Sequence, residues 1–115
     1  MSTPLEGLRV VEMTIAVQGP VAGLYLADMG AEVLKIEPPL GDPTRYFRGV
    51  GNETPIGTLA PQYVACNRGK RSLCIDLATE LGMRAMLRLL DSADVFLSNY
   101  REPALAKLGL DYETL

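Results

Sequence analysis

Three short turns carry the polar residues that are best placed for chemistry, because each turn follows a predicted strand. They are Val17-Gln18-Gly19, the residues directly after Glu37, and Asn99-Tyr100-Arg101. In an open sheet of parallel strands, ligands bind outside the carboxyl ends of the strands. We therefore expect the three turns to line one edge of the sheet and to form a binding site.

Catalytic side chains are harder to identify. The chain has no histidine, which removes the commonest general base and the commonest metal ligand. Asp42, Asp76 and Asp94 are candidates by type alone, and we expect Asp42 to shape a turn and Asp94 to open a strand. Cys66 and Cys74 have the spacing of neither a metal site nor a redox pair. The residues therefore predict a ligand-binding part of an α/β enzyme, with no metal site and without its catalytic residue.

A basic turn, Asn67-Arg68-Gly69-Lys70-Arg71, precedes a predicted strand and should lie at the opposite edge of the sheet. Its density of positive charge suits a phosphate or a carboxylate. From charge alone, however, we favour the interpretation that it is an ordinary solvated turn.

The elements that position these turns alternate between strands and helices. This order predicts an α/β fold, an open parallel sheet flanked by helices. Apolar runs predict the strands, while apolar periodicity, capping residues and prolines predict the helices. In the helix at 80–92, Thr79 is the expected cap and the apolar face includes Leu81, Ala85 and Met86. The predicted strands are 8–14, 32–37, 72–77 and 93–98, and the predicted helices are 20–29, 58–66 capped by Thr58, 80–92 and 103–107 ended by Gly109.

Length and composition indicate one domain, or part of one. The 115 residues are 48% hydrophobic, which is enough for a packed core. A net charge of −3 argues against a general nucleic-acid binder. We see no export signal and no apolar run long enough for a membrane span, so we expect a cytoplasmic protein with reduced thiols and no membrane partner.

A nicotinamide-binding fold is one alternative for this pattern. Glu37 lies at the end of the second predicted strand, where an acidic residue can hold a ribose. The dinucleotide fingerprint, however, requires three glycines after the first strand, and the segment from Thr14 to Gly19 has one. The residues therefore argue against this alternative.

A series of motifs resembles a known family. The motifs, in order, are Leu5–Glu12, Gly19-Pro20, Leu26–Glu37, Gly41–Arg45, Asn67–Leu73, Asp76-Leu77, Ala93–Val95, Asn99–Arg101 and Leu108–Leu110. Together they resemble the start of the class III CoA-transferases, the carnitine dehydratase and bile-acid-inducible type that includes formyl-CoA transferase. The resemblance covers essentially the whole chain.

The resemblance implies a function for a longer protein. Residues 1–115 would form its N-terminal, Rossmann-like CoA-binding domain, and the full-length protein would be a homodimer of interlocked chains. The partners would be an acyl-CoA, as substrate, and a carboxylic acid, with no covalently bound cofactor. CoA would move between acids through an aspartyl-acyl anhydride and an aspartyl-CoA thioester. The nucleophilic aspartate of the family lies beyond residue 115, so the chain alone is expected to be an inactive fragment.

The resemblance also implies site residues. Val17 and Gln18 would approach the thioester, and Lys107 would be a cation for a phosphate. Pro38 stands where some members carry an arginine that contacts a phosphate. The rest of the CoA site would be lined by Ile75, Asp76, Leu77, Ala78, Asn99, Tyr100 and Arg101.

Two further functions stay open at this point. The same family contains 2-methylacyl-CoA racemases, which share the N-terminal pattern and use a downstream histidine and aspartate for proton transfer. A protein from another class, a non-catalytic module that binds CoA, a nucleotide-like ligand or a partner chain, is the other alternative. In that case the apolar helix at 20–29 would be the interaction surface.

Overall fold

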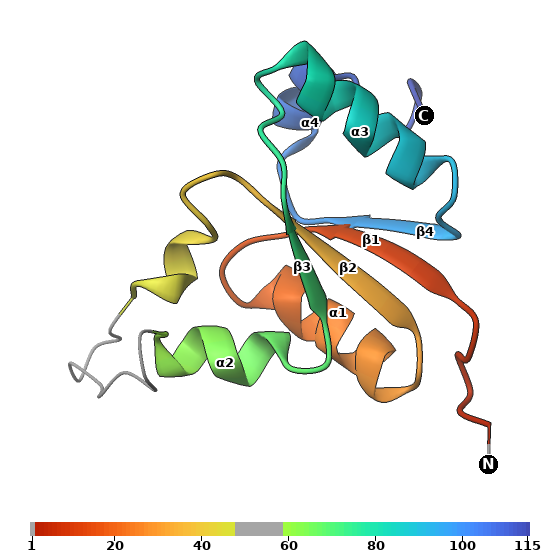
Figure 1. Ribbon diagram of the computed structural model, residues 1–115, viewed down its shortest axis with the longest axis vertical. Coiled ribbons are helices and arrows are strands. Elements are labelled where there is room, and N and C mark those ends of the chain that lie inside the picture. Colours follow the sequence, from red (N-terminus) through yellow and green to blue (C-terminus); the bar gives the residue numbers. More distant parts are fainter. Residues whose placement is uncertain (1, 48–58) are drawn as a thin grey trace.

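The chain forms an open sheet of parallel strands. A computed structural model describes residues 2–47 and 59–115, and within these ranges it contains a four-stranded sheet in the order β3-β2-β1-β4 (Figure 1). Every neighbouring pair is parallel. The predicted α/β class is therefore confirmed. The strands are β1 (Arg9–Met13), β2 (Glu32–Glu37), β3 (Arg71–Cys74) and β4 (Val95–Ser98).

Helices cover both faces of this sheet. α1 and α2 lie on one side and contact each other, whereas α3 and α4 lie on the other side (Figure 1). The chain runs from β1 outward to β2 and β3, and α3 then returns it to β4 on the far side of β1. The helices are α1 (Gln18–Asp28), α2 (Pro61–Asn67), α3 (Glu80–Leu90) and α4 (Glu102–Leu108), with a short 3-10 turn η1 (Pro43–Arg45) after β2.

Local signals set several of the element ends. Thr79 caps α3, because its Oγ1 accepts a hydrogen bond from the Gly82 amide at 3.0 Å. Gly109 ends α4 in the left-handed conformation, with φ of 68°. α2 begins with Pro61 after Ala60, while the expected cap Thr58 lies outside the described residues. Both the Thr79 and the Gly109 predictions are confirmed.

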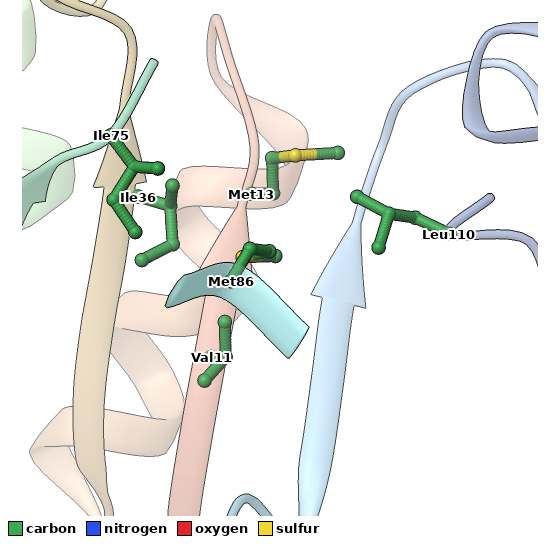
Figure 2. Packing of buried hydrophobic residues seen from close by; sticks show 6 residues of the cluster. All are labelled: Val11, Met13, Ile36, Ile75, Met86 and Leu110. Carbon is green, nitrogen blue, oxygen red and sulfur yellow. The ribbon is translucent and has the colours of Figure 1, made fainter. Parts of the chain in front are cut away.

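The main core lies between the sheet and the helices α3 and α4. Met86 of α3 is fully buried and lies over β1, with Ile36 on one side and Leu110 on the other (Figure 2). Val11 and Met13 complete the strand side of this cluster. On the opposite face, α1 covers a smaller apolar cluster of Val10, Ala31 and Val33.

Some predicted details are wrong. Leu81 is 70% exposed, and Ala85 is exposed too. An α-helix turns about 100° per residue, so Leu81 lies roughly 140° around α3 from Met86 and faces away from the sheet. β3 ends at Cys74 rather than Leu77, because residues 75–78 turn toward α3. α1 begins at Gln18, two residues before its predicted start.

We expect Met86→Ala to lower the free energy of unfolding by about 2–5 kcal/mol, because it leaves a cavity at the centre of the core. Chemical denaturation followed by circular dichroism measures this change. Leu81→Ala in the same helix is the matched control, and an exposed change of this kind should cost at most about 0.5 kcal/mol. Equal losses for the two variants would contradict the assigned face of α3.

Candidate functional site at the carboxyl edge of the sheet

A pocket of about 200 Å³ lies at the carboxyl edge of the sheet. It joins the ends of β1 and β2 to the segment after β3 and to the turn after β4. Five of its residues are among those predicted for the site, so the structure brings these five together. The pocket is lined by Met13, Ile36, Glu37, Pro38, Ile75, Asp76, Leu77, Ala78 and Tyr100.

The other predicted residues lie outside this pocket. Val17 and Gln18 are exposed where α1 begins, and Asn99 and Arg101 are exposed in the turn after β4. Lys107 is exposed in the last turn of α4.

Sequence reasoning placed the segment directly after Glu37, and with it Pro38, at this edge, but it did not place Met13, Ile36 or Glu37 in the CoA site. These three residues lie at the carboxyl ends of β1 and β2. Their positions at strand ends were the signal that could have identified them.

Asn99 ties the turn after β4 to the turn after β1. Its Oδ1 accepts a hydrogen bond from the Ile15 amide at 3.0 Å, and its Nδ2 donates one to the Ile15 carbonyl at 2.8 Å. The two turns leave neighbouring strands whose connecting helices lie on opposite faces of the sheet. This is the topological switch point, where open α/β sheets bind ligands.

The turn between β1 and α1 has a constrained backbone. Ala16 has a φ of 65°, a conformation that side chains other than glycine rarely adopt. A Cβ atom on Gly19 would lie 2.6 Å from Cβ of Thr14 and 2.9 Å from Cγ of Asn99. Glycine at position 19 therefore lets the start of α1 pack directly against both turns.

Glu37 is fully engaged in hydrogen bonds. Its carboxylate accepts from Nε and Nη2 of Arg45, the hydroxyls of Tyr63 and Ser72, and the Asp42 amide, at 2.7–2.8 Å. Burial alone would raise the pKa of this carboxyl, but these hydrogen bonds, led by that of Arg45, hold the pKa far below its ordinary value of 4.5. Because its oxygens are occupied, Glu37 is poorly suited to bind a ribose, which weakens the nicotinamide alternative further.

Tyr100 presents a half-buried ring to the pocket. Burial raises the pKa of its hydroxyl, and the negative charge of Asp42 raises it further. Tyr100 therefore stays neutral at physiological pH and offers an aromatic face with a polar tip.

The three candidate aspartates hold the backbone. Asp42 caps η1 by accepting from the Thr44 amide at 2.8 Å, and Asp76 accepts from the Ala78 amide at 3.0 Å. Asp94 accepts from the Arg9 amide just before β4. The predicted structural roles of Asp42 and Asp94 are confirmed.

The basic turn is not uniformly solvated. Arg68 forms an exposed ion pair with Asp28, as expected of a surface turn. Lys70, in contrast, has a side chain that is 2% exposed and lies 2.8 Å from Oε2 of Glu12. The interpretation of this turn as ordinary surface is therefore wrong for Lys70, because the turn directs that side chain into the space between the sheet and α1.

Comparison with known proteins identifies the family. A model of CoA-transferase family III matches residues 5–115. The chain belongs to this family. The resemblance inferred from the motifs is thereby confirmed.

Named relatives of the chain are CoA-transferases. The succinate–glutarate CoA-transferase of Agrobacterium fabrum is 47% identical over 115 residues, covering 97% of this chain and 29% of that protein. The succinyl-CoA:glutarate CoA-transferase of Homo sapiens is 35% identical over 113 residues, covering 97% of this chain and 25% of that protein. The chain thus spans less than a third of the length of these relatives.

Solved structures of the family share the fold. A CAIB/BAIF family protein from Brucella suis superimposes with a TM-score of 0.87 at 43% identity, covering 99% of this chain and 30% of that one. The orthorhombic form of Rv3272 from Mycobacterium tuberculosis gives a TM-score of 0.83 at 42% identity, covering 98% and 30%.

The part of the chain that the structure describes lacks both a membrane-spanning helix and a metal-binding cluster. Over these residues, no helix is both long enough and apolar enough to cross a membrane. The same residues contain no group of three or more His, Cys, Asp or Glu side chains that could bind a metal ion.

We expect Glu37→Gln to lower the free energy of unfolding by about 3–5 kcal/mol at pH 7. The variant removes the buried carboxylate of the ion pair and leaves the Arg45 guanidinium without its negative partner. The folded-state pKa of Glu37 is depressed, so its stabilisation is present above pH 4.5 and is lost as the pH falls below it. The difference between wild type and variant should therefore shrink as the pH falls from 5 to 3 in urea titrations.

Glu6→Gln is the control for this pH series, since it removes one charge from an exposed position. The same pH dependence in both variants would show that the Glu37 hydrogen bonds do not set the acid sensitivity.

Proposed function

We propose that this chain is the N-terminal CoA-binding domain of a class III CoA-transferase and holds the CoA part of an acyl-CoA at the carboxyl edge of its sheet. The observation that carries the proposal is the family match over residues 5–115, in a fold whose edge pocket contains five of the predicted CoA residues. The names of the relatives, all reported above as CoA-transferases, support the same reaction class.

The pocket suits one flat part of CoA rather than the whole molecule. Its volume of about 200 Å³ is below the about 300–1,000 Å³ of sites that enclose a complete ligand. Apolar side chains of Met13, Ile36 and Ile75 and the ring of Tyr100 line it, and such walls favour an aromatic ring such as adenine. In this proposal, Arg101 and Lys107 are exposed cations available to the phosphates.

The other end of the ligand would meet the start of α1. Val17 and Gln18 are exposed there, and the first turn of the helix contains no acidic residue. Free amide groups at a helix N-terminus attract negative charge. We place the thioester near these two residues, so that an oxygen gaining charge during attack would face them.

The nucleophile is proposed to come from sequence that this chain does not cover. An aspartate would attack the thioester carbonyl and release the CoA thiolate, leaving an aspartyl-acyl anhydride. The thiolate would then attack the aspartyl carbonyl, which gives the aspartyl-CoA thioester and frees the first acid. Asp42, Asp76 and Asp94 already accept backbone hydrogen bonds, so we assign none of them this role.

The remaining proposals concern the whole protein. We propose an acyl-CoA and a carboxylic acid as its substrates, a homodimer as its assembly and the cytoplasm as its location, without a covalently bound cofactor. The racemase alternative has less support, because the relatives reported above carry transferase names. The non-catalytic module is separated from the enzyme by the second experiment below.

We expect the chain to bind CoA in isothermal titration, and Tyr100→Leu to raise the dissociation constant about tenfold, equivalent to about 1.4 kcal/mol of lost ring contact. Tyr112→Leu is the matched control, because this tyrosine is 92% exposed and lies outside the pocket. Equal affinity for wild type and both variants would remove Tyr100 from the site, and absence of CoA binding by the wild type would contradict the proposed function.

We also expect a covalent adduct on the natural protein after incubation with an acyl-CoA, measured by intact mass spectrometry. A CoA or acyl adduct that disappears with hydroxylamine would support an aspartyl nucleophile, because hydroxylamine cleaves thioesters and anhydrides. CoA binding without any adduct, under turnover and single-substrate conditions alike, would favour the non-catalytic module. Exchange of the proton at carbon 2 of the acyl group, lost when the downstream histidine is replaced and seen without a covalent adduct, would favour the racemase.

A further inference from the structure

A cluster of four charged side chains is buried between the sheet and α1. The side chains of Lys35, Lys70, Glu12 and Asp42 are at most 2% exposed. Lys35 Nζ lies 3.0 Å from Oδ2 of Asp42 and 3.4 Å from Oε1 of Glu12, while Lys70 Nζ contacts both oxygens of Glu12, at 2.8 and 3.0 Å. Two positive charges thus meet two negative charges, and the cluster is neutral.

Each ammonium group also binds a backbone carbonyl of the same turn. Lys35 Nζ donates to the Thr14 carbonyl at 2.8 Å, and Lys70 Nζ donates to the Pro20 carbonyl at 2.7 Å. Thr14 directly follows β1, and Pro20 lies in the first turn of α1. The two lysines therefore hold both ends of the turn whose middle contains Ala16, with its φ of 65°.

The helix is shaped to accept this cluster. A Cβ atom on Gly23 would lie 1.9 Å from Oε2 of Glu12 and 3.2 Å from Nζ of Lys70. The absence of a side chain at position 23 therefore lets the carboxylate and the ammonium lie against the backbone of α1.

Stability alone is a weak reason for burying four charges. Removing them from water is costly, and apolar residues of similar volume often give an equally stable or more stable fold. Burial lowers the pKa of Lys70, while its hydrogen bond to Glu12 opposes that shift. What apolar side chains could not supply is a donor for each of the two turn carbonyls.

We propose that Lys35 and Lys70 are positioning residues that hold the turn from Thr14 to Pro20 in its CoA-binding shape. The link to CoA rests on the proposed function, whereas the effect on the turn does not. Neither lysine touches the ligand in this proposal. Both act through the backbone that presents Val17 and Gln18.

Two variants separate positioning from charge balance. Lys70→Met removes the donor to Pro20 and leaves Glu12 short of a partner, so it should lower both stability and order in the turn. Adding Glu12→Gln in a double variant removes the surplus negative charge while Lys35 remains paired with Asp42. The double variant should regain stability yet still lack the donor to Pro20.

Amide hydrogen exchange by NMR reads the turn directly. Ile15, whose amide is held by Asn99, and Val21, whose amide donates to the Val17 carbonyl, are the reporters. We expect both amides to exchange at least tenfold faster in Lys70→Met and in the double variant, relative to core amides of β2. Val33→Ala is the control: it truncates a buried side chain below α1 and should lower stability without a selective change at Ile15 and Val21.

The CoA titration tests the consequence of this positioning. The dissociation constant should rise at least tenfold in the single and double variants and stay within twofold in Val33→Ala. If the double variant recovers stability, slow exchange and affinity together, Lys70 serves only to balance Glu12 and the proposal is overturned. If wild type binds no CoA, the proposed function fails, and the exchange rates alone then support or overturn the positioning role.

Gly23→Ala is a second variant in case Lys70→Met does not fold. It keeps every charge and donor but displaces the Glu12–Lys70 pair from α1. Faster exchange at Ile15 and Val21 would support the proposal. Unchanged exchange, with the pair visibly displaced in a crystal structure of the variant, would overturn it.

Discussion

The buried charged side chains on the α1 side of the sheet, here called the charge layer, are the constraint on which the rest of this structure depends. Glu12, Lys35 and Glu37 point to the α1 side from strands that are buried on both faces. Unpaired charges in such a place would destabilise the fold by several kcal/mol each, in order of magnitude. Glu12 and Lys35 pair with each other, and the further partners Asp42, Arg45 and Lys70 all come from the connection between β2 and β3. The charge layer thereby fixes the paths of the loops after β2 and before β3.

The two faces of the sheet divide the work between them. The side of α3 and α4 is apolar, with Met86 at its centre, and the hydrophobic contacts there have no directional requirement. The side of α1 and α2 combines a smaller apolar cluster with buried polar and charged groups, whose hydrogen bonds demand particular distances and directions. The edge pocket lies where these two layers meet: Met13 and Ile36 come from the apolar face, whereas Glu37 comes from the polar one. Apolar walls beside a rigid polar frame are what a site for one part of a nucleotide-like ligand requires.

Features that depend on neighbouring residues could be predicted from the sequence, whereas features that depend on contacts between distant residues could not. The strand and helix order, the Thr79 cap and the Gly109 stop follow from neighbouring residues, and all are found in the structure. The cluster at 75–78 with Tyr100 followed from the family resemblance together with strand topology.

Lys70 was misjudged because its partner, Glu12, is 58 residues away in the chain. The same limit hid the five donor groups that bind Glu37, which belong to four residues in three segments: the η1 turn, α2 and β3. The prediction that Leu81 belongs to the apolar face of α3 was wrong for another reason. The predicted face was too wide, so it included a residue that points away from the sheet.

The order of the strands also dictates a timetable for folding. β1, α1 and β2 are adjacent in the chain and can form as a local unit, but β4 must pair with β1 across 85 residues. Closing so long a loop lowers the chain entropy before stabilising contacts have formed. We therefore expect β4 to pair with β1 late in folding. On the ribosome, the hydrogen bonds between Asn99 and Ile15, and the side of the pocket lined by Tyr100, therefore form only after nearly all of these 115 residues have emerged. Until then the carboxyl edge of the sheet lacks the turn after β4, so the edge pocket is completed late in the folding of these residues.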